Sequence, residues 1–283
     1  MRFFFAVFSV CFFCSCVSTV EEPKEEGVLL YPSSARLKGL KVNDVAVVST
    51  VIKKDIQISD ITKTTSESKS AVVNIFIKSS SPYNLHLLPS FLPGPKIQVN
   101  VEGVSLGSGF FIHPSGYIIT NDHVINNSKE ILAVTSDNKK YLLSLVAREP
   151  TRDLALLKVS EPDRLFNFLK INPNNFNMEG EMVLAIGNPL GLGHTVSMGI
   201  ISQTHRDLSK LTKNDDVLFL QTDAAINPGS SGGPLISLAR GCVGVNTAGI
   251  QNGGSLNFAV PADDVLEFLE KAVKAEGKQI PNP

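Results

Sequence analysis

Twelve short apolar runs, separated by Gly, Pro, Asn and Asp turns, constrain the fold of this 283-residue chain most strongly. They begin with SAVVNIFI at 70–77, end with LNFAVP at 256–261, and are rich in Val, Ile, Phe and Leu. Runs of this length and composition predict β-strands. Helices of ten or more residues do not alternate with them, which argues against a parallel α/β sheet and favours antiparallel barrels or a sandwich. Twelve strands exceed the needs of one small barrel, so we expect two barrels side by side.

One segment has the periodicity of an amphipathic helix, ADDVLEFLEKAVKAEG at 262–277. Asp263 and Asp264 lie at its positive end and Gly277 lies beyond its last turn, as is typical of helix termini. We expect this helix to cap the second barrel with one apolar face. That face consists of Val265, Phe268, Leu269, Ala272 and Val273.

The first residues, MRFFFAVFSVCFFCSC at 1–16, have the pattern of a signal peptide. The apolar run at 3–13 follows an early Arg and is too short to span a bilayer, but it has the length of a signal-peptide core. Cys16 follows a small residue, and this resembles a bacterial lipoprotein cleavage site. We therefore expect export to the periplasm and a lipid anchor on Cys16. The alternative is ordinary cleavage near Ser18 or Val20.

The four cysteines follow the same division of the chain. Cys11, Cys14 and Cys16 lie in or just after the apolar run, so removal of the signal peptide leaves Cys242 with no internal partner. We interpret Cys242 as a small core residue, with a reactive thiol as the less favoured alternative.

The remaining organisation is a tether at 17–65 without a long helix, a protease-sized domain at 66–276 and a short tail at 277–283. With 26 basic and 27 acidic residues and no Lys/Arg block, the chain has no electrostatic footprint for nucleic acid. It has neither an H-E-x-x-H motif nor paired Cys/His spacing, so we predict no metal and no cofactor.

The stretch DAAINPGSSGGPL at 223–235 contains the candidate nucleophile, Ser231. A serine becomes nucleophilic when an imidazole takes its proton and a carboxylate orients that imidazole. GSSGG at 229–233 fits the G-x-S-x-G elbow of α/β-hydrolases, but in that fold the histidine follows the serine. All five histidines here precede Ser231. The orders that remain are those of chymotrypsin-type barrels and subtilisin-type folds, and the strand pattern disfavours the second.

His123 is the candidate base, because it ends the predicted strand GYIITNDHVI, where a side chain can face a cleft. His86, His113 and His194 lie in Pro- or Gly-rich stretches and are interpreted as exposed turn residues. Asp122 is adjacent to His123, and neighbours on a strand point to opposite sides.

Asp153 is the candidate acid, because it begins the apolar strand DLALLKV and a partly buried carboxylate needs a partner. That partner is His123 if the site is catalytic and Arg152 or a backbone turn if it is structural. The oxyanion hole is expected in the turn of Gly229, Ser230 and Ser231. The N–H groups of the first and last of these would converge on the oxyanion, with Ser230 as a bystander.

These motifs together resemble the HtrA (Deg) serine proteases of the chymotrypsin clan. The shared segments are GSGFFIHPSGYIITNDHVI, RDLALLKV, VLAIGNPLGLGHTVSMGIIS, LQTDAAINPGSSGGPLI and GVNTAGI with LNFAVP. The resemblance covers about 70–274 and implies His123, Asp153 and Ser231 as the triad, in two six-stranded barrels. Asp122 and Ser230 depart from the residues usual in the family. Most relatives carry a PDZ domain after the protease domain, and we expect none here and no peptide sensing of the usual kind.

The resemblance also implies a primary specificity pocket walled by Ala225, Ile226, Ala248 and Ala259. These residues offer no carboxylate, so we expect cleavage after small or medium aliphatic residues and not after basic ones. It further implies unfolded or damaged envelope proteins as substrates, and a homotrimer formed through 42–61. The alternatives are a chaperone-like binding protein with an inactive triad and a lipid-anchored adhesion module.

Overall fold

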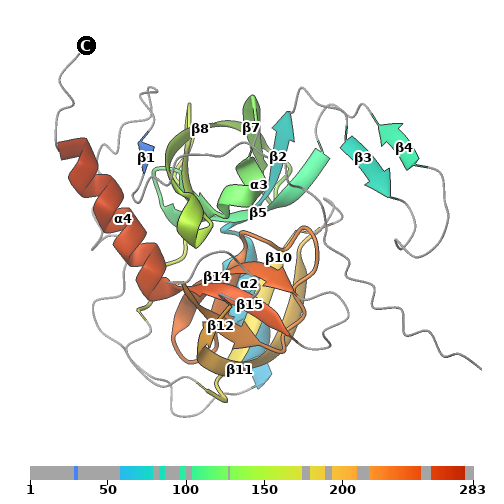
Figure 1. Ribbon diagram of the computed structural model, residues 1–283, viewed down its shortest axis with the longest axis vertical. Coiled ribbons are helices and arrows are strands. Elements are labelled where there is room, and N and C mark those ends of the chain that lie inside the picture. Colours follow the sequence, from blue (N-terminus) through green and yellow to red (C-terminus); the bar gives the residue numbers. More distant parts are fainter. Residues whose placement is uncertain are drawn as a thin grey trace, which may run out of the picture.

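Two closed barrels and two longer helices form the part of the chain that this computed structural model describes (Figure 1). The signal-peptide residues, Cys16 and most of the predicted tether lie outside the described residues. The described ranges are 29–30, 58–78, 83–86, 96–99, 104–126, 128–173, 179–188, 193–208, 217–249 and 256–277. None of the helices in these ranges is long and apolar enough to cross a membrane.

The first barrel is antiparallel, and pairing between β8 and β9 closes it. The order around the barrel is β8, β7, β2, β5, β6 and β9, and β1 adds to β8 on the outside. Its strands are β1 (Leu29–Leu30), β2 (Val72–Lys78), β5 (Val104–His113), β6 (Tyr117–Thr120), β7 (Glu130–Val134), β8 (Lys140–Glu149) and β9 (Leu154–Val159).

The second barrel is also antiparallel and follows the first in the chain. Its order is β10, β11, β12, β15, β14 and β13, so the last two strands of the chain lie between β12 and β13. The strands are β10 (Met182–Gly187), β11 (Thr195–Asp207), β12 (Leu218–Thr222), β13 (Pro234–Ser237), β14 (Gly241–Gly249) and β15 (Asn257–Pro261). The fold expected from the twelve runs is therefore confirmed, and a separate hairpin of β3 (Tyr83–His86) and β4 (Lys96–Val99) was not predicted.

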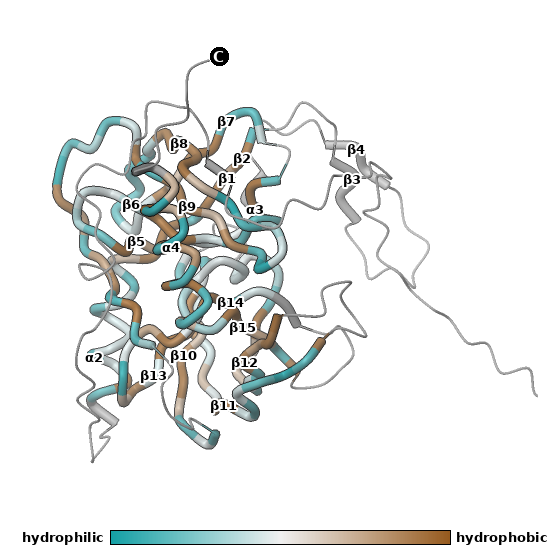
Figure 2. The backbone as a smooth tube through the Cα atoms, turned by 60° about the vertical axis from the view of Figure 1, so that its left-hand side comes forward, coloured by the Kyte–Doolittle hydropathy of each residue, from teal (hydrophilic) through white to brown (hydrophobic). Residues whose placement is uncertain are grey.

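Several strands of the first barrel are buried on both faces, which explains why their sequences read as continuous apolar runs. In β9, Ala155 and Leu157 belong to the cluster inside the first barrel. Leu154 and Leu156 point the other way, into a cluster shared with the second barrel and the C-terminal helix. The brown segments of Figure 2 follow these strands. The two barrels thus share one apolar layer, and β10 contacts β2 and β5.

The C-terminal helix α4 (Ala262–Gly277) begins where predicted but includes Gly277, and it buries the predicted face, with Val273 partly buried. It contacts β14 and β15, as expected for a helix that caps the second barrel. It also contacts β1 and β9 of the first barrel (Figure 1), which the sequence did not indicate. The helix therefore lies across both barrels.

A second helix, α2 (Ile58–Lys69), contradicts the expectation that the tether lacks a long helix, and the predicted domain boundary at residue 66 falls inside it. Its sequence, ISDITKTTSESK, is polar at most positions, so a helical apolar stripe is hard to recognise. Ile61 supplies its contact with the shared apolar layer.

Candidate active site

The three predicted catalytic side chains come from three connections between strands. His123 lies in the helical turn α3 (Asp122–Ile125) directly after β6, so the expectation that it ends a strand is wrong. The extended backbone of Asn121 (φ −80°, ψ 150°) ends the strand first, and its side-chain amide donates to the carbonyl of Asp153 at 3.0 Å. Asp153 caps the 3₁₀ turn η1 (Pro150–Arg152) before β9. Ser231 lies in the turn between β12 and β13.

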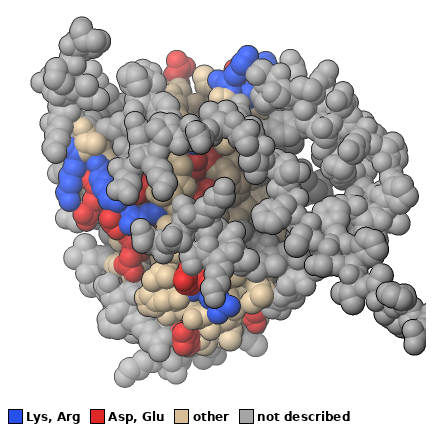
Figure 3. Space-filling view, viewed as in Figure 1, with Lys and Arg blue, Asp and Glu red and all other residues tan. Residues whose placement is uncertain are grey.

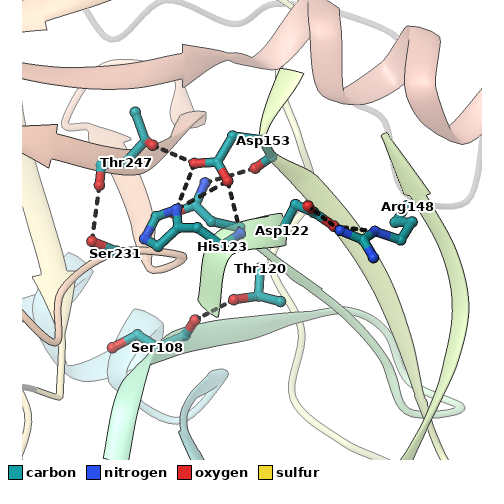
Figure 4. Close-up of polar contacts among 9 residues, drawn as sticks. Ser108, Thr120, Asp122, His123, Arg148, Asp153, Ser231 and Thr247 are labelled. Atoms are coloured by element: carbon teal, nitrogen blue, oxygen red, sulfur yellow. Dashed lines mark hydrogen bonds and ion pairs between the residues drawn. The ribbon is translucent and has the colours of Figure 1, made fainter. Parts of the chain in front are cut away.

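The side chains of His123 and Asp153 meet at the end of the first barrel where β6 ends and β9 begins (Figure 4). The Nδ1 atom of His123 is 2.8 Å from Oδ2 and 2.9 Å from Oδ1 of Asp153. The backbone N–H of His123 also donates to Oδ1, at 2.9 Å. Because an ionised carboxylate only accepts hydrogen bonds, Nδ1 carries the proton and Nε2 is left as the basic nitrogen.

The backbone of Asp153 is left-handed, with φ 55° and ψ 45°, and its N–H donates to the carbonyl of Pro150 at 3.2 Å. Aspartate and asparagine adopt this conformation more readily than most residues. Arg152, the structural alternative as a partner, contacts Glu149, Asp264 and Glu267 instead. The carboxylate of Asp153 is therefore aimed at His123 by the turn that carries it.

Thr247, at the end of β14, connects Ser231 to Asp153 (Figure 4). Its hydroxyl donates to Oδ2 of Asp153 at 2.6 Å, and its carbonyl accepts from Oγ of Ser231 at 2.8 Å. In Figure 4 the imidazole of His123 lies between Asp153 and Ser231. Sequence reasoning missed Thr247, because a threonine at the end of an apolar strand carries no signal of its own.

The environment of His123 sets its basicity. Burial lowers the pKa of His123, but the hydrogen bond and charge of Asp153 and the charge of Asp122 together raise the pKa above the ordinary 6.5. The side chain of His123 is 52% exposed and that of Asp153 is 25% exposed. The imidazole is thus partly accessible to solvent, while the carboxylate beside it is largely enclosed.

Asp122, the rival acid, turns away from His123 and binds Arg148 of β8 in a fork (Figure 4). Burial raises the pKa of Asp122, and the hydrogen bonds and charge of Arg148 oppose that shift. The prediction that Asp122 points elsewhere is confirmed, although the two residues lie in a helical turn and not on a strand.

The turn around Ser231 contains left-handed glycines on both sides of it, with φ 96° at Gly229 and 85° at Gly232. A Cβ atom at Gly232 would lie 2.1 Å from the carbonyl oxygen of Ser108, so only glycine fits between the two backbones. Ser230 is buried, and its N–H donates to the carbonyl of Asn227 at 2.8 Å. This bond makes Ser230 unavailable as an oxyanion donor and agrees with its interpretation as a bystander.

The four residues predicted to wall a specificity pocket lie near this turn or on β14 and β15. Ala225 is exposed, and its carbonyl accepts from Ser197 at 2.6 Å. Ile226 and Ala259 pack in the cluster inside the second barrel, and Ala248 pairs with Phe258. A neighbour that sequence reasoning missed is Asn257, whose side-chain oxygen accepts from the N–H of Ile226 at 3.3 Å.

None of the three histidines interpreted as turn residues lies in a turn. His86 and His113 end the strands β3 and β5. His194 is half-buried, with Nε2 3.0 Å from the carbonyl oxygen of Val72. Cys242 is buried in the shared apolar layer, as expected for a core residue.

Comparisons with known proteins agree with this arrangement. The Trypsin-like peptidase domain family matches residues 107–245. A protein of Rickettsia prowazekii (strain Madrid E), described as a DegP-like periplasmic serine endoprotease, is 35% identical over 256 residues, 84% of this chain and 49% of its own length. A protein of the same description from Pseudomonas savastanoi pv. phaseolicola (strain 1448A / Race 6) is 42% identical over 180 residues, 62% of this chain and 36% of its own. This chain thus spans half or less of these relatives.

Solved structures extend the likeness to the fold. The serine endoprotease from Yersinia pestis is 32% identical, with a TM-score of 0.59 over 78% of this chain and 68% of that chain. The HtrA-type protease AlgW with decapeptide is 31% identical, with a TM-score of 0.63 over 78% of this chain and 69% of that chain.

Proposed function

This chain belongs to the HtrA (Deg) family of serine proteases, and from that premise we propose that it is an exported serine endopeptidase that hydrolyses unfolded or damaged proteins of the cell envelope. The observation that carries the proposal is the pairing of Nδ1 of His123 with Asp153 at 2.8 Å, with Ser231 joined to the same carboxylate through Thr247. Because this pairing leaves Nε2 of His123 as the basic nitrogen, the imidazole is suited to act as a general base.

In the proposed reaction, the hydroxyl of Ser231 exchanges its bond with Thr247 for one with Nε2 of His123. The serine oxygen then attacks the scissile carbonyl while its proton passes to Nε2, and Asp153 stabilises the imidazolium. The N–H groups of Gly229 and Ser231 bind the oxyanion. The imidazolium returns the proton to the leaving amine, and water later releases the acyl group from Ser231 by the same route.

Labelling with a fluorophosphonate probe tests the enzyme class and the nucleophile together. We expect one modified tryptic peptide, labelled on Ser231, and loss of both label and peptide cleavage in Ser231→Ala. Label on another serine, or none, contradicts the proposal. Wild type and Ser231→Ala are also compared in suppressing the aggregation of an unfolded substrate. If both suppress it equally well and neither cleaves the substrate, the chain is a chaperone-like binding protein.

The proposed specificity is for small or medium aliphatic residues before the cleaved bond. Ala225, Ile226, Ala248 and Ala259 carry no charge, so a basic side chain would enter without a partner at a cost of several kcal/mol by rough transfer scales. Peptides that differ only in Val, Ala, Arg or Lys at that position give the test. Fastest cleavage of the Arg or Lys peptides would contradict it.

Periplasmic location, a lipid anchor on Cys16 and a homotrimer complete the proposal. Location rests on the relatives' description as periplasmic and on the signal-peptide pattern, and the anchor rests on Cys16 alone. Membrane fractionation of wild type and Cys16→Ser tests the anchor, because only the wild type is expected to sediment with membranes. The molar mass of the purified protein by light scattering tests the trimer.

A further inference from the structure

Ser108 of β5 lies on the first barrel but makes two hydrogen bonds that hold the Ser231 turn against that barrel. We propose that Ser108 is a positioning residue for the oxyanion hole, an inference that rests on the proposed function. It acts by fixing the two peptide groups next to the N–H donors.

The first bond fixes the peptide between Gly229 and Ser230. The hydroxyl of Ser108 donates to the carbonyl of Gly229 at 2.7 Å, and the N–H of Ser230, at the other end of that peptide, donates to Asn227 at 2.8 Å. Because a peptide group is planar and nearly always trans, bonds at both ends fix its orientation. The N–H of Gly229 is attached to the same α-carbon as this fixed group.

The second bond fixes the peptide after Ser231. The backbone N–H of Ser108 donates to the carbonyl of Ser231 at 2.8 Å. Between the two held carbonyls lies the Ser230–Ser231 peptide, whose carbonyl accepts from Gly233 at 3.1 Å. The N–H of Ser231 belongs to that peptide. Both N–H groups assigned to the oxyanion are therefore flanked by groups that Ser108 holds.

Ser108 is itself held by two further hydrogen bonds, as a positioning residue must be. Its hydroxyl accepts from the N–H of Asn188 at 2.8 Å, so its donor bond is directed at Gly229 and not at solvent. Its carbonyl accepts from the hydroxyl of Thr120 at 2.7 Å, and Figure 4 shows these two residues below the site. The residue is fully buried. A hydroxyl is the group that can donate and accept at once in this position.

The test compares Ser108→Ala with Ser237→Ala in the full-length protein. Ser237 is an equally buried serine of β13 whose hydroxyl contacts Glu181 and accepts from Ala239 and Arg240, so it controls for loss of a buried hydroxyl. We expect kcat for a peptide anilide to fall about 10- to 100-fold in Ser108→Ala with KM changed less than about 2-fold. Ser237→Ala keeps its kcat.

A second readout separates positioning from general damage. A peptide boronic acid forms a tetrahedral adduct whose oxygen occupies the oxyanion hole, so its affinity is expected to fall by the same factor as kcat in Ser108→Ala. Binding of the uncleaved peptide, measured with Ser231→Ala in the background, is expected to stay unchanged. Thr120→Val, which removes the bond to the Ser108 carbonyl at nearly constant volume, is expected to give a smaller loss of the same kind, and it serves if Ser108→Ala does not fold.

The outcomes distinguish this inference from the proposed function. Unaltered kcat and boronate affinity in Ser108→Ala, or equal losses in boronate and ground-state peptide binding, overturn the role of Ser108 while the protease assignment stands. Wild-type protein that neither cleaves the anilide nor accepts the fluorophosphonate overturns the protease assignment, and the role of Ser108 with it.

Discussion

Arg148 binds the carboxylate of Asp122 at two points, with Nε 2.6 Å from Oδ1 and Nη2 2.6 Å from Oδ2. The two side chains are 17% and 8% exposed. Arg148 belongs to β8 and Asp122 is the neighbour of His123, so this ion pair fastens the helical turn that carries the base to the wall of the first barrel. A planar guanidinium fork suits such a fixed geometry better than an ammonium group.

Breaking this pair is expected to destabilise the protein strongly. Arg148→Met leaves a buried carboxylate without its partner, which costs about 3–5 kcal/mol in the free energy of unfolding. Asp122→Asn with Arg148→Met removes both charges and is expected to recover much of that loss. The free energy of unfolding of both variants is measured by urea denaturation. Lys63→Met, which breaks an exposed pair with Glu67, is the control and is expected to change stability by less than about 1 kcal/mol. Equal effects of Arg148→Met and Lys63→Met would contradict a structural role for the fork.

The pH dependence of kcat/KM is expected to report His123. A general base acts in its neutral form, so activity is present above the pKa of His123 and is lost as the pH falls through it. Because Asp153 and Asp122 raise that pKa, the acidic midpoint should lie above 6.5. In Asp153→Asn the raising contribution of the carboxylate is gone and burial remains, so the midpoint should move to lower pH.

The same variant tests the role of Asp153 in rate. Asparagine tolerates the left-handed backbone at this position but stabilises the wrong imidazole tautomer, and in the serine-protease template such a change lowers kcat about 10⁴-fold. Steady-state kinetics across pH give both readings, with circular dichroism as the control for folding. A midpoint that rises, or a kcat within tenfold of wild type, would contradict the assignment.

A second ion network ties the turn that carries Asp153 to the C-terminal helix. Arg152 lies 3.5 Å from Glu149, 3.4 Å from Asp264 and 2.9 Å from Glu267 of α4, and Lys271 lies 3.3 Å from Glu149. Figure 3 shows basic and acidic side chains gathered over α4. Charged side chains of the first barrel and of α4 thus meet beside the turn that carries Asp153.

Arg152→Ala is expected to lower the free energy of unfolding by about 2 kcal/mol, because the Glu149 side chain is only 4% exposed and loses one of its two cations. It should also lower kcat severalfold, since Arg152 is the last residue of η1 and Asp153 caps that turn. Thermal unfolding and peptide kinetics measure these effects. Lys274→Ala, which breaks a surface pair with Glu270, is the matched control and should leave both unchanged. A loss of stability without any loss of kcat would contradict the expectation that the contacts of Arg152 with α4 help to position Asp153.

Cys242 should be inert in the folded protein. Burial raises the pKa of its thiol to about 12, so little reactive thiolate is present at mildly alkaline pH. Alkylation with iodoacetamide, followed by mass spectrometry of the peptide that contains Cys242, is expected to show label only after denaturation in guanidinium chloride. Label acquired at a similar rate under native conditions would show that this thiol is accessible and support the reactive alternative.

The barrels could be predicted from sequence because each strand has a recognisable local sequence pattern. Runs such as DLALLKV combine β-branched and aliphatic residues between turn residues, and all twelve became strands. The helix α2 could not be predicted in the same way, since its stability comes from the contact of Ile61 with a distant apolar layer and not from an apolar stripe. The local pattern of apolar residues gives no information on such tertiary contacts.

The candidate site divides along the same line. His123, Asp153 and Ser231 could be proposed from the sequence because their residue types, order and motifs imply one another. Thr247 and Ser108 were missed because their contacts are made by single hydroxyls and backbone groups. Both look like ordinary strand residues until the chain is folded. The helical turn at His123 was also missed, because it occupies only four residues after a strand.

The placement of His123 and Asp153 on one barrel and Ser231 on the other has a consequence for the life of the molecule before it is fully folded. A nascent chain in which either sheet has closed alone holds an imidazole without a hydroxyl to activate, or a hydroxyl without an imidazole. Under the proposed mechanism such a chain lacks a complete triad, so proteolysis would begin only after both barrels have closed and packed together.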